Sequence, residues 1–169
     1  MLKLPEILRG CKIFPVVPMG KEPATKAGWH IATDDPAQIA EWQRVNPDFN
    51  WALATGPSGL FVIDVDPNGL DWWAKLLERD PTIREAVERA YQVRTPRGGL
   101  HVYFRGEGPS TASRIADGID TRGGIQRDGK IVSGGYLLLP GSKTANGAYR
   151  EHPGGSINPL PSAISAIIP

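Results

Sequence analysis

The chain has only one cysteine, Cys11, among its 169 residues. A lone cysteine excludes an intramolecular disulfide framework and a thiolate-based structural zinc site, and the default expectation is a small buried side chain. No run of about 18 apolar residues occurs, and the first residues do not form the apolar segment of a signal peptide. We therefore expect a cytoplasmic protein without a membrane partner.

A strong excess of one charge is also absent, because the net charge is only +1. This balance argues against a protein that coats nucleic acid by bulk charge. The charges are unevenly distributed, since residues 94–130 contain seven Lys or Arg against four Asp or Glu and are therefore net +3. Any basic surface is expected to be local and to involve this segment.

The length fits one domain with a single hydrophobic core, and the composition, 40% hydrophobic and 22% charged, is that of an ordinary folded protein. Asp35 followed by Pro36 predicts the start of a helix that runs to about residue 45. Apolar runs at residues 51–54 and 60–65 predict two buried strands. These elements would frame the centre of the domain.

The rest of the chain alternates helical and strand patterns. A helix pair is predicted after Gly69, interrupted at Asp80, and a hairpin is predicted from residues 91–95 and 100–105. Strand-rich halves with inserted helices, rather than strict alternation, indicate an α+β fold. Further predicted elements are a short strand after residue 14, strands at 118–121, 130–133 and 136–139, and a closing helix at 161–168.

The sharpest chemical pattern is the pair Asp64 and Asp66 in the sequence LFVIDVD, residues 60–66. Side chains alternate along a strand, so both acids would share one face. Two carboxylates about 6 to 7 Å apart on a half-buried surface repel unless a cation neutralises them, and Mg²⁺ or Mn²⁺ suits such oxygen ligands. The alternative, a plain turn at residues 66–69, does not explain an acid inside an apolar run.

A second pattern is the glycine-containing turn before His101, in the sequence TPRGGLHVYF of residues 95–104. Gly98 and Gly99 would allow a ligand to approach the backbone closely. Arg97 and His101 could both donate hydrogen bonds to phosphate oxygens. The alternative is an ordinary hairpin with a structural histidine.

A third pattern places Asp120 and Arg122 on one strand face in the sequence GIDTRGG, residues 118–124. A third carboxylate would complete the ligands of a two-metal site, and the arginine could offset the charge of a triphosphate or a template. The alternative is a solvated Asp–Arg pair in a glycine-rich turn. The order of the three patterns is more specific than any one of them.

In this order the motifs resemble the primase-polymerase (prim-pol) branch of the archaeo-eukaryotic primase superfamily, which occurs in replication proteins of plasmids, phages and integrated elements. The resemblance covers about residues 12–150 of a single domain of residues 1–169. Residues 151–169 would then be a C-terminal tail, compatible with a link to a larger replication protein. The matching segments are 18–23 (PMGKEP), 28–29 (GW), 51–56 (WALATG), 64–66 (DVD), 99–101 (GLH), 119–120 (ID), 134–142 (GGYLLLPGS) and 146–149 (NGAY).

The chain departs from the family pattern in two places. Residues 125–133 are interposed before the Gly-Gly-Tyr segment, as a hairpin or loop near the site. Gly99 stands where many members have serine, which removes one hydroxyl that could donate to phosphate. The interposed segment leaves the roles of Arg127 and Lys130 open.

The resemblance implies an α+β prim-pol fold with mixed and antiparallel sheets, an RRM-like catalytic half and flanking helices. It implies two Mg²⁺ or Mn²⁺ ions held by Asp64, Asp66 and Asp120, with His101 on the incoming triphosphate. Around these residues we predict nucleotide contacts from Lys21, Arg97, Gly99 and Arg122, and template contacts from Arg94, Arg105, Arg114, Arg127 and Lys130.

The activity implied is template-dependent synthesis of primers, extension of DNA, or both, by attack of a primer 3′-hydroxyl on the α-phosphate of a dNTP or NTP. The expected partners are a single-stranded DNA template, a primer and a helicase domain or protein, because the chain contains no Gly-x-x-x-x-Gly-Lys-Ser/Thr loop of its own. The host would be bacterial or archaeal, with the protein encoded by a phage, plasmid or integrated element.

Three other functions remain open. A sugar-nucleotide glycosyltransferase also uses an Asp-x-Asp motif, but it needs no counterpart of His101 or Asp120 in this order. A metal-dependent nuclease would degrade the template. A replication-initiation module could bind nucleic acid on the same scaffold without catalysis, since a fold does not establish an activity.

Overall fold

The computed structural model describes residues 2–169, except the side chains of residues 132 and 133. The strands are β1 (Ile13–Val16), β2 (Asn50–Ala54), β3 (Leu60–Val65), β4 (Tyr91–Arg94), β5 (Leu100–Arg105), β6 (Thr111–Ala116), β7 (Ile119–Arg122), β8 (Ile125–Arg127), β9 (Lys130–Ser133), β10 (Tyr136–Leu138), β11 (Lys143–Thr144), β12 (Gly147–Ala148) and β13 (Arg150–His152). The helices are α1 (Pro36–Val45), α2 (Leu70–Arg79), α3 (Pro81–Glu88) and α4 (Ser162–Ser165), with 3-10 turns η1 (Glu6–Leu8), η2 (Gly28–Ile31) and η3 (Pro67–Gly69).

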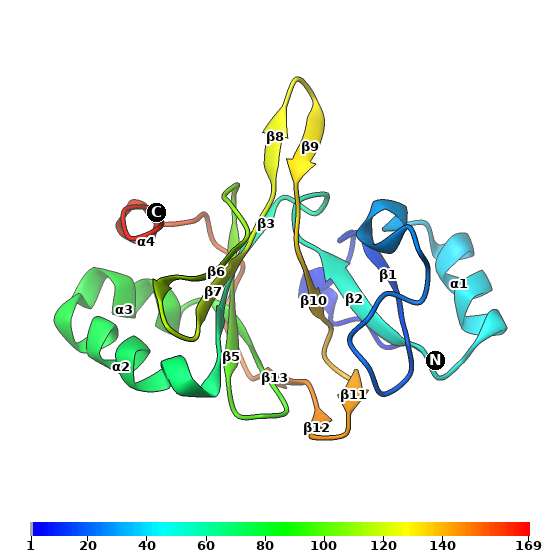
Figure 1. Ribbon diagram of the computed structural model, residues 1–169, viewed down its shortest axis with the longest axis horizontal. Helices are drawn as coiled ribbons and strands as arrows, with labels where there is room; N and C mark the ends of the chain where they lie inside the picture. Colours follow the sequence, from blue (N-terminus) through cyan, green and yellow to red (C-terminus); the bar gives the residue numbers. More distant parts are fainter. Residues whose placement is uncertain (1) are drawn as a thin grey trace.

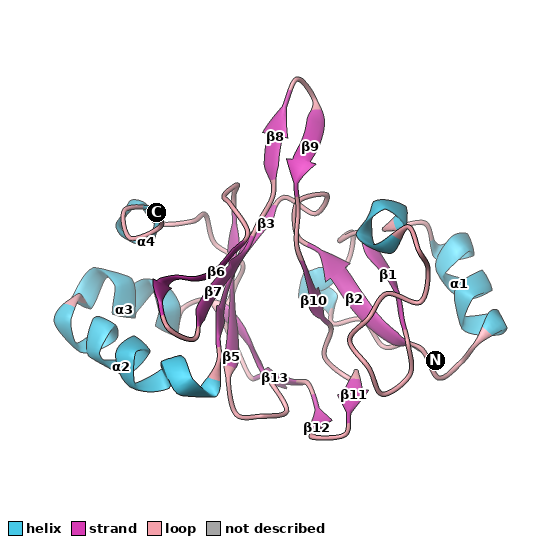
Figure 2. Ribbon diagram, viewed as in Figure 1, coloured by secondary structure: helices cyan, strands magenta, loops and turns pink. Residues whose placement is uncertain are grey.

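Two sheets face each other and carry helices on their outer sides (Figures 1 and 2). One has the strand order β1-β2-β10 and the other the order β13-β4-β5-β3-β7-β6. All strand pairings in these sheets are antiparallel, and the parallel contacts in the described chain are two isolated bridges. The α+β fold with flanking helices is therefore confirmed, whereas the expected mixed pairing is limited to those bridges.

Helix α1 follows the predicted bounds. Asp35 caps its first turn by accepting a hydrogen bond from the backbone N–H of Ala37, and Pro36 occupies the first helical position. Ile39 and Trp42 pack against the three-stranded sheet, where the Trp42 ring lies 6.3 Å from that of Trp51. The helix therefore covers the outer side of this sheet.

The six-stranded sheet is apolar on both faces around β3. Val62 faces the three-stranded sheet, while its neighbours Phe61 and Ile63 face α2 and α3. The alternation of a strand thus produces two hydrophobic clusters rather than the single core expected from the length. Because Asp64 lies two residues after Val62, it shares the face turned toward the space between the sheets.

The interposed segment, residues 125–133, is a hairpin that projects from the body of the molecule where the chain passes from one sheet to the other (Figure 1). Asp128 and Gly129 both have positive φ angles, which suits a tight two-residue turn between β8 and β9. Arg127 and Lys130 face each other across this turn and are exposed. The segment therefore presents two basic side chains at its tip.

The expected tail, residues 151–169, is an integral part of the domain. Strand β13 pairs with β4 at one edge of the six-stranded sheet, and the backbone N–H of Arg105 donates to the carbonyl of Asn158. The predicted closing helix is present as the shorter α4, and Ile164 within it is fully buried against α3. The chain beyond residue 150 thus completes the outer core.

The other predicted strands and the helix pair are found close to their expected positions. Strand β6 was not predicted, because the sequence TASRIA has no clear apolar alternation; it forms as an irregular edge strand on β7. Cys11 is only partly buried, which corrects the expectation of a buried thiol. No helix of the described chain is both long and apolar enough to span a membrane.

Candidate functional site

The three sequence motifs meet in one row across the six-stranded sheet. Strand β3 lies between β5 and β7, and Asp64 is paired in register with His101 on one side and with Asp120 on the other. Directly opposed residues of antiparallel strands point to the same face with Cβ atoms about 4.5 to 5.5 Å apart. The register therefore places an acid, a histidine and a second acid side by side, facing the three-stranded sheet.

Asp64 is the central and electrostatically most perturbed member of the row. Its side chain is 16% exposed. Burial, together with the neighbouring acids Asp66 and Asp120, raises the pKa of Asp64 to about 7, although the positive charges of Arg122 and Lys21 act in the opposite direction. The nearby positive charges therefore offset the effect of burial on this carboxyl group only in part.

His101 is almost completely buried beside Asp64, with its Nε2 atom 3.5 Å from the Asp64 Oδ1 atom. Burial, and to a smaller extent the cations Lys21 and Arg122, lowers the pKa of His101 to about 3. The imidazole is thus neutral near pH 7. Its Nδ1 atom has no hydrogen-bond partner among the described residues. A neutral, buried histidine of this kind can donate one hydrogen bond to a ligand oxygen.

Asp120 is held by two donors. The backbone N–H of Ser113 donates to Oδ1 at 2.8 Å, and Arg122 donates from Nη2 to Oδ2 at 2.7 Å. The same Arg122 nitrogen lies 3.8 Å from Oδ2 of Asp64. Among the described residues no group of three Asp, Glu, His or Cys side chains converges as a metal site in this arrangement. The two neighbouring carboxylates instead share a guanidinium group.

Asp66 lies one residue beyond the end of β3 and is exposed. Its backbone N–H donates to the carbonyl of Gly118 at 2.8 Å, which fixes the chain at this point. Together with Asp64 and His101 it lines a small pocket that also includes Arg97. Asp66, the remaining predicted metal ligand, therefore lies beside the row, at its solvent side.

Gly99 has a structural reason to be small. A Cβ atom at this position would lie 2.3 Å from the carbonyl oxygen of Val65 and 3.4 Å from the Cα atom of Asp66. The turn before β5 thus passes directly over the end of β3. Gly98, next to it, has a φ angle of +92° and open space around it. We predicted that these glycines would let a ligand approach the backbone closely. At Gly99 the group that approaches is the protein's own backbone at the end of β3.

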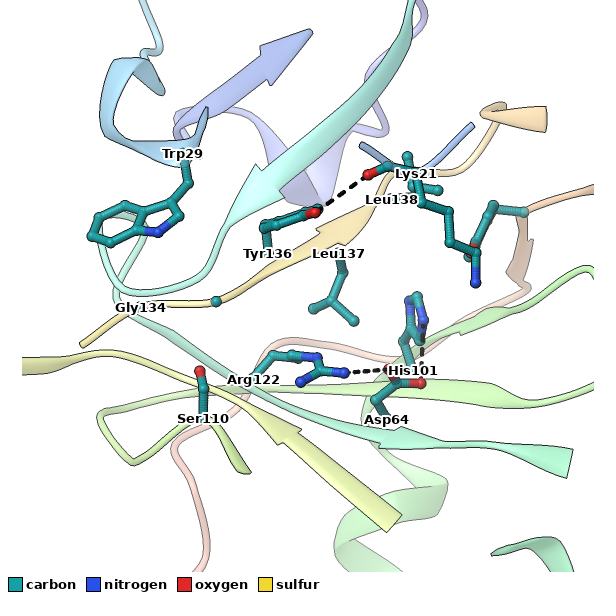
Figure 3. Close-up of a pocket in the computed structure, with 12 residues that line it drawn as sticks. Lys21, Trp29, Asp64, His101, Ser110, Arg122, Gly134, Tyr136, Leu137 and Leu138 are labelled. Carbon is teal, nitrogen blue, oxygen red and sulfur yellow. Dashed lines mark hydrogen bonds and ion pairs between the residues drawn. The ribbon is translucent and has the colours of Figure 1, made fainter. Parts of the chain in front are cut away.

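A cleft of about 450 Å³ opens between the two sheets in front of the row (Figure 3). This volume is in the range typical of small-molecule sites. Asp64, His101 and Arg122 enter the cleft from the six-stranded sheet, while Tyr136 and Leu137 of β10 lie on the opposite side. The cleft therefore combines an ionic side with an aromatic and apolar side.

The predicted nucleotide-binding residues surround this region. Lys21 lines both the cleft and the small pocket, and the hydroxyl of Tyr136 donates to its carbonyl oxygen at 3.3 Å. Arg97 lines the small pocket beside Asp66. Three basic side chains, Lys21, Arg97 and Arg122, are therefore distributed along the continuous region that contains the acids.

The predicted template-binding residues are dispersed. Arg105 is at the opposite end of β5 from His101, and Arg94 is exposed on β4, opposite Arg150 of β13. Arg114 is exposed on the edge strand β6. Arg127 and Lys130 form the basic tip of the β8–β9 hairpin, whose base at Gly134 adjoins the cleft. Only the hairpin residues are both exposed and linked directly to the cleft wall.

Eight cleft residues were not predicted as functional, and four of them have a side chain that ends in an aromatic ring or a hydroxyl group: Trp29, Ser110, Tyr136 and Tyr149. Trp29, Tyr136 and Tyr149 belong to segments that resemble the family, so this resemblance was the available signal. The ring of Trp29 also accounts for the glycine at position 134, because a Cβ atom at Gly134 would lie 3.0 Å from the Trp29 ring. Ser110 stands in a segment without a recognisable pattern and had no such signal.

Comparison with known proteins connects this geometry to a family. The chain matches the family described as Prim-Pol, bifunctional DNA primase/polymerase, N-terminal, over residues 5–163. This span is wider than the predicted residues 12–150, in agreement with the integral position of the C-terminal segment. A search of curated proteins gave no match. Because the match covers nearly the whole chain, the protein belongs to the Prim-Pol family of bifunctional DNA primase/polymerase N-terminal domains.

Proposed function

We propose that this chain is a template-dependent nucleotidyltransferase that makes primers, extends DNA, or both, from nucleoside triphosphates. The observation that carries the proposal is the row formed by Asp64, His101 and Asp120 in front of a cleft lined with basic side chains. Membership of the Prim-Pol family supports a nucleotidyltransferase in general. The row supplies the groups that such chemistry requires.

The donor set fits divalent cations. Asp64 and Asp120 offer carboxylate oxygens on adjacent strands, Asp66 offers another at the end of β3, and a positive group already lies between the first two. Oxygen-only ligands of this type suit Mg²⁺ or Mn²⁺. When bound, two such ions would stabilise the attacking 3′-oxygen and the charge of the leaving pyrophosphate. These three acids are the proposed ligands.

The protein itself would position the triphosphate. Lys21 and Arg97 stand on the solvent side of the row, where they can bind phosphate oxygens by charge-assisted hydrogen bonds. His101 is neutral, so it would donate a single directed hydrogen bond and add no charge. Correct alignment of the reacting atoms, rather than proton transfer by these residues, is the expected contribution.

The β8–β9 hairpin is the best-placed candidate for template binding, because Arg127 and Lys130 are exposed at its tip. Replacing both with serine should weaken binding of single-stranded DNA. The slope of log affinity against log salt should become shallower by about 0.7 for each DNA phosphate that the variant no longer neutralises. Fluorescence anisotropy at several salt concentrations measures both effects.

A matched control removes two charges from the helical side of the molecule. Arg79 and Arg84, exposed on α2 and α3, are replaced with serine in the same way. This double variant should keep the wild-type affinity and salt slope. Equal loss of affinity in both double variants would show that DNA binding depends on the total charge of the protein. Wild-type affinity in the hairpin variant would show that the hairpin does not bind the template.

The proposal is tested by incubating the chain with single-stranded template, Mn²⁺ or Mg²⁺, and labelled nucleotides, with and without a primer. Products that lengthen only in the presence of template are expected. Shortening of the template would indicate a nuclease, and transfer of sugar from UDP-sugars without use of dNTPs would indicate a glycosyltransferase. DNA binding without incorporation under any of these conditions would indicate a binding module and contradict the proposal.

A further inference from the structure

Arg122 occupies the position between the two carboxylates that the proposed function assigns to a cation. One nitrogen, Nη2, lies 2.7 Å from Oδ2 of Asp120 and 3.8 Å from Oδ2 of Asp64. The residue reaches this position because Asp120 and Arg122 are two apart on β7 and share a strand face. The guanidinium group and a divalent ion cannot both fill the space between these oxygens.

The arginine has an electrostatic reason to be there. The side chains of Asp64 and Asp120 are 16% and 12% exposed, so two neighbouring negative charges are largely shielded from water. Such a pair requires a positive partner. No group of three ligand side chains in the described part of the chain is assembled for a metal. The protein without ligands therefore neutralises the acids with its own side chain.

The guanidinium group of Arg122 is also able to move away from the two carboxylates. Its side chain is 30% exposed and lines the cleft, and the polar contacts of its guanidinium within the described structure are those with the two carboxylates. Figure 3 shows the guanidinium beside Asp64 at the edge of the open space. A triphosphate in the cleft would offer several oxygens in place of the carboxylates, and guanidinium binds phosphate in a forked geometry.

We propose that Arg122 is an exchangeable counter-ion, which neutralises Asp64 and Asp120 in the nucleotide-free protein and moves onto the triphosphate when a nucleotide enters. This inference rests on the proposed function, which identifies the ligand as a nucleoside triphosphate. Without a nucleotide, divalent ions compete with Arg122 for the carboxylates of Asp64 and Asp120. A bound nucleotide removes this competition because Arg122 then binds the triphosphate. Metal binding and nucleotide binding become linked, and each must strengthen the other by the same factor.

The test is a titration of nucleotide-free protein with Mn²⁺ alone, in which electron paramagnetic resonance measures the concentration of free Mn²⁺ at each step. Arg122→Gln should bind Mn²⁺ between about 5-fold and 150-fold more tightly than the wild type, the usual range of such couplings. Arg122→Lys keeps the charge and should remain near the wild-type affinity. Asp64→Asn combined with Arg122→Gln should lose the gain, which assigns the bound ion to this site.

Lys21→Gln is the matched control, because Lys21 lines the same cleft and carries the same charge but has no ion pair with either acid in the described structure. Its gain in Mn²⁺ affinity should be much smaller than that of Arg122→Gln. Equal gains would mean that long-range charge, rather than occupation of the site, controls the metal, and the proposal would be wrong. Thermal melting with and without Mn²⁺ checks folding and should show a larger stabilisation by Mn²⁺ in Arg122→Gln.

Failure of this inference is distinguishable from failure of the proposed function. If Arg122→Gln binds Mn²⁺ no better than a wild type that still incorporates nucleotides, the counter-ion role is wrong and the enzymatic function stands. If the variant gains affinity while the wild type incorporates no nucleotide on any template, the counter-ion role stands and polymerisation is excluded.

Discussion

Replacing Asp64 with asparagine is expected to abolish nucleotide incorporation while the fold is retained. The central acid of the row would lose the charge needed to hold a divalent ion, and loss of several kcal/mol of transition-state stabilisation corresponds to a decrease of about 10³-fold or more. Stability should not fall, because burial raises the pKa of Asp64 and the ionised carboxylate opposes folding at neutral pH. Primer extension and thermal melting measure the two effects.

The control for this variant is Asp71→Asn. Asp71 is exposed in the first turn of α2, on the helical side of the six-stranded sheet. It should retain wild-type incorporation. An Asp64→Asn protein that extends primers at the wild-type rate, or a loss of activity explained by unfolding, would contradict the assigned role of the acid.

Replacing Gly99 with alanine is expected to damage both stability and activity. The new Cβ atom would lie 2.3 Å from the carbonyl oxygen of Val65, a distance that requires the backbone to move. That backbone is fixed by the pairing of β3 with β5 and by the hydrogen bond from Asp66 to Gly118. Overpacking of this type costs about 1 to 3 kcal/mol, and the shift would displace Asp66 and His101.

Denaturant unfolding combined with primer extension measures this outcome. Gly98→Asn is the matched control, because the neighbouring glycine has open space and asparagine tolerates its positive φ angle. The control should lose little stability and keep its activity. If Gly99→Ala were as stable and active as this control, the close approach of the turn to the end of β3 would not determine the site.

Much of the fold was predictable because it follows local rules. The cap at Asp35, the break at Asp80 and the apolar runs of β2 and β3 define elements without reference to the rest of the chain. Strand β6 was missed because its polar sequence is strand-like only through its pairing with β7. The division of the core into two clusters also depends on which elements cover each face of the sheet.

The charged residues of the candidate site were singled out from the sequence, but their arrangement was not predictable. Asp64, His101 and Asp120 are separated by long stretches of chain. Their alignment arises from the registers in which β5 and β7 pair with β3, and these registers cannot be read from the sequence. The relation of Asp120 to Arg122 was foreseen as a shared strand face. Its consequence, a guanidinium between two acids, required the neighbouring strand, since Asp64 supplies the second carboxylate.

Taken together, the proposed function and the counter-ion role of Arg122 place a cation between Asp64 and Asp120 in the position of the guanidinium group when a nucleotide is bound. A crystal grown with Mn²⁺ and a non-hydrolysable nucleoside triphosphate tests this through the anomalous scattering of manganese. We predict an anomalous peak in contact with the carboxylates of Asp64 and Asp120, with Arg122 turned toward the triphosphate. A triphosphate bound elsewhere, or bound here with Arg122 still paired to both acids and no manganese between them, would contradict the account.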